Sequence, residues 1–298
     1  VNENGGKVTV VENSHIYNRA PIEVFKNDGV IVLALGEGSL VSGEANAVAE
    51  IEISENQVEL ARQAHASGKK VVGVIFGGRP LALQNIEPYL DAILYAWHCG
   101  TETAHAACDI LFGDVNPSGK ASVTFVKSTG HIPLYYNELA PAKKINPYFG
   151  IDNVVKTTSG FSGYLDVPAV PMYPFGFGLS YTTFEISDLQ LSTDALKSGE
   201  TMKASVLVKN TGNYDGEEVV QLYIRDYFAS MVRPVKELKG YQKIFLKAGE
   251  EMRVEFDVTE ETLKFFDCNR NFVAEEGKFA LMIGNSSENV LSQDFSFN

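Results

Sequence analysis

Val30-Ile-Val-Leu-Ala-Leu35 is a continuous apolar run, and Gly36-Glu-Gly-Ser-Leu-Val-Ser-Gly-Glu-Ala-Asn46 follows it directly. A short β-rich run that ends in glycines predicts a buried parallel strand that opens into a loop. In open α/β sheets, ligands bind in the crevice outside the carboxyl ends of the strands, which is where such loops lie. The glycines can bend this loop without steric cost. The stretch therefore predicts an α/β fold with a candidate site at Glu44.

Strand-like apolar runs alternate with helical patterns from residue 1 to residue 135. Alternating β and α elements imply a mostly parallel sheet covered by helices. We therefore predict an α/β sandwich domain over residues 1–135. Its expected strands are Val8–Val11, Val30–Leu35, Val71–Phe76, Ala92–Ala96 and Ser122–Phe125.

Two helices are expected between these strands. Ser54 and Gln57 fit a capping box, in which Ser54 caps a backbone N–H and Gln57 reaches back, and Gly68 is suited to end the helix. The second helix is expected to start after Gly100, with Thr101 as its N-cap. Helical spacing predicts one buried apolar face on it, formed by Ala104, Ala107, Cys108 and Leu111.

The hydrophobic period changes to two in the last third of the chain. Apolar and polar residues alternate along Met202–Val208 and Met252–Val258, and the same spacing occurs at Val220–Ile224 and Phe279–Ile283. About seven short strands in about 120 residues are typical of an immunoglobulin-like or fibronectin type III-like sandwich. We predict such a β-sandwich over residues 176–298, so that the fold class of the whole chain is α/β plus all-β.

The segment between these domains, residues 136–175, matches neither pattern. It contains five of the eleven prolines and many aromatic residues. A flexible linker would be polar and would contain few aromatic residues. We therefore expect this segment to be ordered and to staple the two domains together.

The charge of the chain excludes several classes of partner. The formal net charge is -13, and the sequence pI is about 4.9. An acidic chain is a poor partner for phosphate backbones and anionic membranes, but it accommodates a neutral substrate such as a sugar. No run approaches the ~20 apolar residues of a membrane span. We expect binding to neither nucleic acid nor membrane.

Cysteine usage bears on the compartment. Cys99, Cys108 and Cys268 form no CxxC pair, which is typical of a reducing compartment. We expect a cytoplasmic location, with periplasmic or secreted locations as alternatives. The chain begins at Val1 without an initiator methionine or a signal peptide, so we expect a fragment or a processed product.

Few residues are candidates for chemistry. There is no GxGxxG and no GxSxG motif. A zinc site is not favoured at His98, Cys99, His105 and Cys108, because His98 and Cys99 are adjacent and Cys108 belongs to the apolar helix face. We expect no metal and no cofactor. Position alone leaves Glu44 open between a surface glutamate and a catalytic one.

The nearby glutamates and the other histidines are not expected to take part in chemistry. We interpret Glu37, Glu50 and Glu52 as solvated acidic surface residues. His65 is expected at the solvated end of its helix, and His131 lies beside a turn.

Several motifs of the chain occur in an order that is specific to one family. They are Val71-Val-Gly-Val-Ile-Phe-Gly-Gly-Arg-Pro-Leu-Ala-Leu83, Ala96-Trp-His-Cys-Gly-Thr-Glu102, Leu111-Phe-Gly-Asp-Val-Asn-Pro-Ser-Gly-Lys120, Ile132-Pro-Leu-Tyr-Tyr-Asn137, Tyr164-Leu-Asp-Val-Pro168, Tyr173-Pro-Phe-Gly-Phe-Gly-Leu-Ser-Tyr-Thr-Thr-Phe184, Val208-Lys-Asn-Thr-Gly212, Glu218-Val-Val-Gln-Leu-Tyr223 and Arg233-Pro-Val-Lys-Glu-Leu-Lys-Gly-Tyr-Gln-Lys243. As a set, they resemble family 3 glycoside hydrolases over residues 28–298. The chain resembles the C-terminal half of a bacterial β-glucosidase of that family.

This resemblance implies a role for Glu44. In the family's β-glucosidases, a barrel domain supplies an aspartate nucleophile, and the α/β sandwich domain supplies the acid/base glutamate. The matching pattern here is Ser42-Gly-Glu-Ala45, so Glu44 is expected to be the acid/base. The chain departs from the family at Val48-Ala-Glu50, where family members often have an Arg-x-Asp or Arg-x-x pattern. This departure affects how the loop is aligned with the family and whether Glu44 has a charged partner.

The resemblance also implies that part of the machinery lies elsewhere. The barrel is absent, and the usual opening strand of the sandwich domain is not recognisable in residues 1–27. We expect the barrel to precede or follow this region, the substrate to be a β-glucoside or a related oligosaccharide, and the isolated chain to be inactive. The alternatives are a non-catalytic carbohydrate-binding or scaffolding module and a homo-oligomerisation half.

Overall fold

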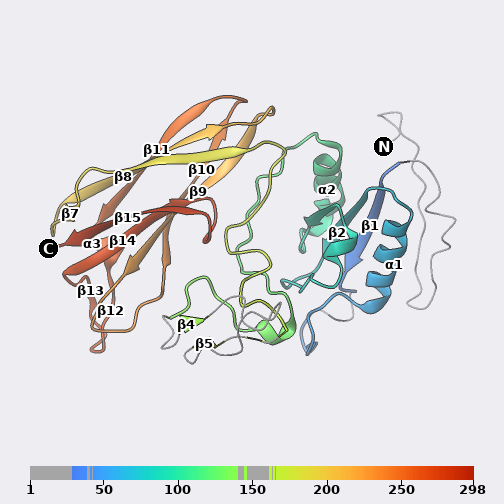
Figure 1. Cartoon of the computed structure of the whole chain (residues 1–298), viewed down its shortest axis with the longest axis horizontal. Helices are drawn as coiled ribbons and strands as arrows, with labels where there is room; N and C mark the ends of the chain where they lie inside the picture. Colours follow the sequence, from blue (N-terminus) through green and yellow to red (C-terminus); the bar gives the residue numbers. More distant parts are fainter. Residues whose placement is uncertain are drawn as a thin grey trace. The chain divides into compact units, whose positions relative to one another are not determined.

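A computed structural model describes residues 29–38, 41, 43–139, 144–145, 161–162, 164 and 166–298. The chain divides into two compact units (Figure 1). The first comprises Val1–Cys108 and Lys127–Gly130, and the second comprises Asp109–Val126 and His131–Asn298. The expected strand Val8–Val11 and most of the segment 136–175 lie outside the described residues. The domain boundaries at residues 135 and 175, and the stapling role of the segment between them, stay predictions.

The first unit contains a parallel sheet, as predicted. Its described strands are β1 (Ile31–Gly36), β2 (Val71–Phe76) and β3 (Ala92–Tyr95), in the order β1-β2-β3. Leu35 pairs with Ile75, and Ile75 pairs with Tyr95, so the carboxyl ends of the three strands meet at one edge of the sheet. The side chains of Leu33, Leu35 and Ile75 are buried in the core.

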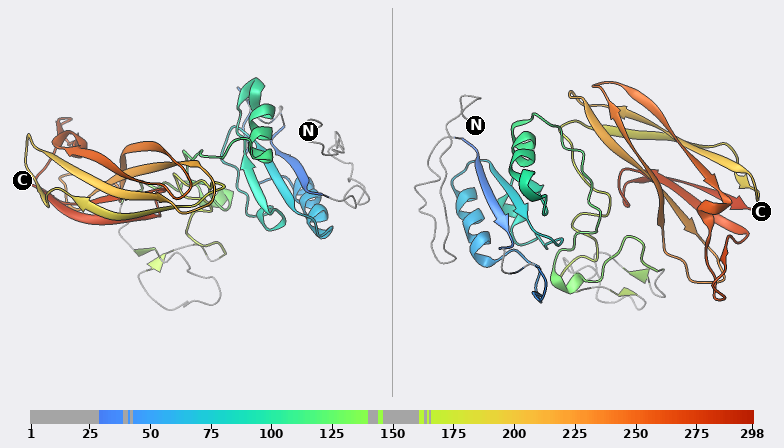
Figure 2. Two further views of the ribbon diagram at one scale, coloured as in Figure 1. Left: turned by 90° about the horizontal axis from the view of Figure 1, so that it is seen from above. Right: turned by 180° about the vertical axis from the view of Figure 1, so that it is seen from behind.

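Helix α1 (Glu55–Ala66) connects β1 to β2 and packs along the sheet (Figure 2). It buries Val58, Ala61 and Ala64, which recur at the helical period. Gly68 follows the helix with a φ of +75°, so the glycine predicted to end the helix is confirmed. The capping box is wrong, because Ser54 is the N-cap but its side chain makes no capping hydrogen bond.

Helix α2 (Thr103–Phe112) begins one residue later than an N-cap at Thr101 predicts. Gly100–Glu102 form a 3₁₀ turn instead, and the Thr103 hydroxyl donates to the Gly100 carbonyl at 2.6 Å. The prediction of a buried face is wrong for most of its members. Of these, Ala107 is buried, Leu111 is half-buried, and Ala104 and Cys108 are exposed in the described structure. The spacing correctly identified the apolar face of the helix, but few of the described residues pack against that face.

The second unit contains a two-sheet, mostly antiparallel sandwich with the predicted period-two strands, and its layers are visible in Figure 2. One sheet has the order β11-β8-β6, and the other has the order β10-β9-β14-β15-β7. The bounds are β6 (Phe184–Leu191), β7 (Ala195–Leu196), β8 (Thr201–Asn210), β9 (Gly216–Asp226), β10 (Glu237–Leu246), β11 (Glu251–Thr259), β14 (Gly277–Gly284) and β15 (Val290–Phe297). The fold class α/β plus all-β is therefore confirmed.

The core of the sandwich is formed by the expected alternating positions. Val206, Val220, Leu222 and Leu281 are among its fully or nearly fully buried side chains. Met252 is an exception, because it lies at the start of β11 and is 42% exposed. The remaining short elements are the 3₁₀ turns Glu87–Tyr89 and Thr129–His131, β4 (Lys144–Ile145), β5 (Phe161–Ser162), α3 (Glu260–Leu263), β12 (Phe265–Phe266) and β13 (Phe272–Val273).

The predicted strand Ser122–Phe125 is wrong as a member of the parallel sheet. Phe125 donates from its backbone N–H to the Tyr173 carbonyl at 2.9 Å, and Ala121 donates to the Phe177 carbonyl at 2.8 Å. The segment thus pairs with residues 172–177 in the second unit. A short apolar run shows that a chain segment is extended and buried, but it does not show which partner it pairs with.

A buried ion pair connects the same region to the sandwich. The Lys120 ammonium lies 2.6 Å from a Glu218 carboxylate oxygen, and the two side chains are 10% and 5% exposed. Lys120 also donates to the Gly178 carbonyl at 2.7 Å. Glu218 accepts hydrogen bonds from the backbone N–H of Val219 and from the Asn285 amide. These charges are buried because each has several partners.

Candidate active site

The loop after β1 is fixed where it leaves the sheet. Gly36 has a φ of +124°, and a Cβ there would lie 1.8 Å from the Phe76 carbonyl oxygen, so this position requires glycine. The Gln57 side chain accepts a hydrogen bond from the Gly36 N–H at 2.7 Å and donates to the Gly36 carbonyl at 2.8 Å. Gln57 therefore bridges α1 and β1 rather than reaching back to cap its own helix. This contact satisfies both backbone groups of the last residue of β1.

Glu44 lies on an exposed turn of this loop. Gly43 and Ala45 both have positive φ values, +121° and +65°, and the Asn46 N–H donates to the Gly43 carbonyl at 3.2 Å. The Glu44 side chain is exposed and makes no hydrogen bond or ion pair to the described part of the chain. Its carboxylate is therefore available to a group outside these residues.

Glu37, at the start of the same loop, does not have the environment that we predicted. Its side chain is 9% exposed, and one carboxylate oxygen lies 3.3 Å from Nε of Arg79. The prediction of a solvated surface residue is wrong because an arginine 42 positions along the chain follows β2 to the same edge of the sheet. Nη2 of Arg79 also donates to the Val41 carbonyl at 3.2 Å.

Tyr95, at the end of β3, also lies at this edge of the sheet. Its role there was not predicted from the sequence. Its hydroxyl donates to the Arg79 carbonyl at 2.6 Å and accepts a hydrogen bond from the Leu81 N–H at 3.1 Å. Burial, with a smaller contribution from the Glu37 charge, raises the pKa of Tyr95 to about 12. The hydroxyl therefore stays protonated at neutral pH and remains a donor. The only sequence signal was that Tyr95 ends a predicted parallel strand.

Trp97 follows Tyr95 and adopts an unusual backbone conformation. Its φ is +51°, a region that bulky residues rarely occupy. The Trp97 and Tyr95 rings are in contact, with centroids 4.6 Å apart. Residues that follow all three strands thus lie at the carboxyl edge of the sheet, where open α/β sheets bind their ligands.

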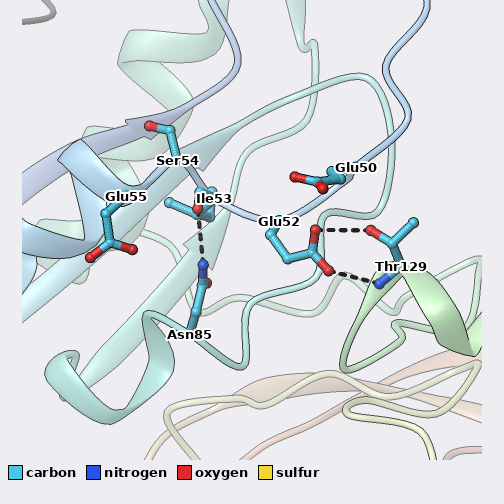
Figure 3. Close-up of a pocket in the computed structure, with 7 residues that line it drawn as sticks. All are labelled: Glu50, Glu52, Ile53, Ser54, Glu55, Asn85 and Thr129. Atoms are coloured by element: carbon cyan, nitrogen blue, oxygen red, sulfur yellow. Dashed lines mark hydrogen bonds between the residues drawn. The ribbon is translucent and has the colours of Figure 1, made fainter.

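A separate open pocket lies beside the start of α1 (Figure 3). Its volume is about 590 Å³, and its lining residues are Glu50, Glu52, Ile53, Ser54, Glu55, Asn85 and Thr129. Glu52 accepts hydrogen bonds from the backbone N–H and the hydroxyl of Thr129, at 2.8 and 2.9 Å. Burial alone would raise the pKa of Glu52, but these hydrogen bonds outweigh it and hold the pKa below the ordinary value.

Glu50 and Glu52 were both predicted to be solvated surface residues, and the prediction is right for only one of them. Glu50 is exposed, as expected. Glu52 is only half-exposed and holds the 3₁₀ turn at Thr129, so the prediction of a solvated residue is wrong for it. Asn85 donates to the Ile53 carbonyl at 2.9 Å and fixes the opposite wall of the pocket.

The histidines and cysteines form no metal-binding group among the described residues. The Cys99 thiol donates to the Ala96 carbonyl, and the His105 ring contacts Glu102 at 2.6 Å. All three cysteines are free and exposed. His65 is exposed near the end of α1, as expected, whereas His131 is buried and its ring lies against Tyr164. In the described parts of the chain, no helix has the length and apolar character needed to cross a bilayer.

Comparison with known proteins identifies two domain families. The glycosyl hydrolase family 3 C-terminal domain matches residues 11–181, and the fibronectin type III-like domain matches residues 218–287. A periplasmic beta-glucosidase of Salmonella typhimurium is 42% identical over 274 residues, which is 92% of this chain and 35% of the relative. A beta-xylosidase of Formosa agariphila is 36% identical and covers 90% of this chain and 35% of the relative.

A solved structure shows the same similarity in three dimensions. The crystal structure of a β-glucosidase from Listeria innocua in complex with glucose superposes with a TM-score of 0.84 at 39% identity. The match covers 93% of this chain and 38% of the Listeria chain. This chain spans about a third of the length of these relatives.

Proposed function

Because this chain belongs to the glycosyl hydrolase family 3 C-terminal domain, we propose that it is the C-terminal region of a retaining β-glucosidase and that Glu44 is its acid/base residue. Two relatives are named as a beta-glucosidase and a beta-xylosidase, and the structural match is a β-glucosidase with bound glucose. These names support a terminal β-glucoside or a related β-linked sugar as the substrate. The nucleophile belongs to a part of the enzyme outside this chain.

The observation that carries the proposal is that Glu44 is exposed on the loop after β1, whereas the Glu37 and Glu52 carboxylates are engaged by other groups. A general acid must reach the glycosidic oxygen at hydrogen-bond distance. Glu37 is nearly buried and is paired with the half-buried Arg79. Glu52 is held by Thr129, and its lowered pKa is opposite to what a general acid needs at neutral pH. Glu44 is exposed on the loop that follows β1.

The proposed reaction has two steps. Retaining glycosidases place two carboxyl groups about 5–5.5 Å apart, one to attack the anomeric carbon and one to protonate the departing oxygen. The Glu44 carboxylic acid would donate its proton to the glycosidic oxygen while the nucleophile forms a glycosyl ester. The resulting Glu44 carboxylate would then accept a proton from the water that cleaves this ester. These steps use no metal or cofactor.

The other properties of the proposed enzyme follow from its sequence and relatives. We retain the absence of nucleic-acid and membrane binding as predictions from the charge of the chain. The compartment is also a proposal: the cysteines favour the cytoplasm, whereas the Salmonella relative is named as periplasmic. Glucose and xylose remain the two candidate glycones, since relatives of both names match this chain.

Leaving-group dependence tests the role of Glu44 in the full-length enzyme. In Glu44→Ala, kcat/KM for phenyl β-glucoside should fall by about 10²–10⁴, because its leaving group needs a proton. Dinitrophenyl β-glucoside should still form the glycosyl-enzyme, because its leaving group departs unprotonated. Glu50→Ala, which removes another exposed glutamate close in sequence, is the control and should leave both rates unchanged. Equal losses on both substrates in Glu44→Ala, or no loss on either, would contradict the assignment.

A further inference from the structure

We propose that Arg79 and Glu37 are positioning residues that hold the Glu44 loop in the geometry needed for proton transfer. This inference rests on the proposed role of Glu44. We call the set formed by the Glu37 carboxylate, the Arg79 guanidinium and the Val41 carbonyl the Arg79 anchor. It reaches the loop at its first residue and again three residues before Glu44.

The Arg79 guanidinium is placed so that it contacts the loop at two points. Nε of Arg79 faces the Glu37 carboxylate at 3.3 Å, while Nη2 donates to the Val41 carbonyl at 3.2 Å. One rigid, planar group therefore contacts two points of the same loop. A lysine could not do this, because its ammonium is a single point charge on a flexible stem. The Glu37 and Arg79 side chains are 9% and 26% exposed, so solvent screens the pair less than a surface pair.

The anchor is itself fixed to the sheet. The Tyr95 hydroxyl donates to the Arg79 carbonyl and accepts from the Leu81 N–H, so the backbone around Arg79 is tied to the end of β3. The Glu37 N–H donates to the Phe76 carbonyl at 2.9 Å, which ties the other partner to the end of β2. The backbone of each residue of the ion pair is thus hydrogen-bonded to the end of a strand.

The loop needs such a contact. Gly36, Gly43 and Ala45 have positive φ values, and the Asn46–Gly43 hydrogen bond closes only a single turn around Glu44. A glycine-containing loop has many accessible conformations when nothing holds it. A misplacement of about 1 Å can cost about 100-fold in rate, so a loop that carries a catalytic acid requires a support of this kind.

The chain offers a matched control for the pair. Arg62 and Glu59 form an ion pair on α1, and the Arg62 side chain is 60% exposed. Arg62→Met and Glu59→Gln make the same chemical changes as Arg79→Met and Glu37→Gln, but away from the loop. The Glu59 side chain is 27% exposed, and an i, i+3 ion pair on a helix surface contributes little, so these variants should behave as the wild type.

The kinetic test uses the full-length enzyme. In Arg79→Met and Glu37→Gln, kcat/KM for phenyl β-glucoside should fall by about 10- to 100-fold, because the acid is misplaced. The rate of glycosyl-enzyme formation from dinitrophenyl β-glucoside and the inhibition constant for glucose should change by less than about twofold, because neither depends on the proton of Glu44. Arg79→Lys should lie between wild type and Arg79→Met. A merely structural role would lower both rate parameters together and raise the inhibition constant for glucose, and that result would overturn the proposal.

Hydrogen exchange measures the anchor separately from the chemistry. In Arg79→Met, amides of residues 41–46 should exchange faster, while those of residues 55–66 in α1 should not change. Unchanged exchange in the loop would overturn the anchor. Faster exchange without the leaving-group difference would overturn the positioning role, provided that Glu44→Ala shows that difference. If Glu44→Ala itself lacks the difference, the proposed function fails, and the exchange result alone decides whether the anchor holds the loop.

Discussion

Glu44 and Glu218 place the same side chain in opposite environments. Glu44 is exposed on a turn at the edge of a parallel sheet and has no partner among the described residues. Glu218 is 5% exposed in the second unit and contacts Lys120, Val219 and Asn285. A carboxylate in water can react with an incoming group, whereas a carboxylate with a full set of partners is committed to structure.

This comparison shows how a motif can be separated into chemical and structural parts. The segment that carries Lys120 and the strand that carries Glu218 both belong to the motifs from which we recognised the family, yet the structure gives them a role in joining chain segments. The Gly43-Glu44 turn contributes little to packing, since Gly43 and Glu44 are exposed. The proposed acid/base role of Glu44, rather than packing, would account for the place of this turn in the family pattern.

The largest predicted effect concerns the exposed residue Glu44. The isolated 298-residue chain should show no turnover of an aryl β-glucoside, because the proposed role of Glu44 is to protonate the leaving group and no nucleophile is expected in the chain. The measurement is release of the aryl alcohol by the purified chain, with the full-length enzyme as the positive control. Reproducible turnover after a contaminating glycosidase has been excluded would show that this chain contains a complete site.

The next largest effect concerns the buried ion pair between Lys120 and Glu218. Lys120→Met should lower the free energy of unfolding by about 3 kcal/mol, near the low end for breaking a buried ion pair, because Val219 and Asn285 still donate to Glu218. The measurement is urea unfolding followed by far-UV circular dichroism.

Two further variants sharpen this result. The double variant Lys120→Met/Glu218→Met should recover most of the loss, since hydrophobic replacement of a buried pair is often neutral. Glu44→Ala should change stability by less than about 0.5 kcal/mol, as a surface substitution does. A Lys120→Met variant as stable as Glu44→Ala would remove the distinction between the two glutamates.

The last predicted effect concerns Glu52, whose exposure lies between that of Glu44 and that of Glu218. Its pKa is lower in the folded chain than the ordinary value of 4.5, so its hydrogen bonds to Thr129 stabilise the fold above that pH. This stabilisation is lost as the pH falls through the folded-state pKa. Glu52→Gln should cost about 1 kcal/mol at pH 7 and less at pH 3. A cost that stays constant between pH 7 and pH 3, measured by urea unfolding at each pH, would show that the charge of Glu52 is not involved.

The sequence predicted those features that depend on local periodicity. Continuous apolar runs predicted the buried strands β1 and β2. Alternating apolar residues predicted β8 and β14, because alternate side chains of a strand point to the same face. The Glu44 loop was also predictable, because glycines after a parallel strand indicate a loop at the carboxyl edge.

Features that depend on distant partners were not predictable. The pairing of Glu37 with Arg79 and the contact of Gln57 with Gly36 join residues that only the folded sheet brings together. Local rules gave Gln57 a capping role and Glu37 a surface role, because the competing tertiary partner is invisible to them. The same limitation explains the misassigned segment Ser122–Phe125, whose partner lies about 50 residues later.

Azide rescue tests the central claim, that Glu44 is the acid/base, most directly. In full-length Glu44→Ala, dinitrophenyl β-glucoside should form a glycosyl-enzyme that stalls, because no base activates water. Azide needs no deprotonation, so adding it should restore turnover and yield β-glucosyl azide. The Glu50→Ala enzyme should show no such rescue. If azide rescues Glu50→Ala and leaves Glu44→Ala unchanged, the register of the loop is wrong and Glu44 is not the acid/base.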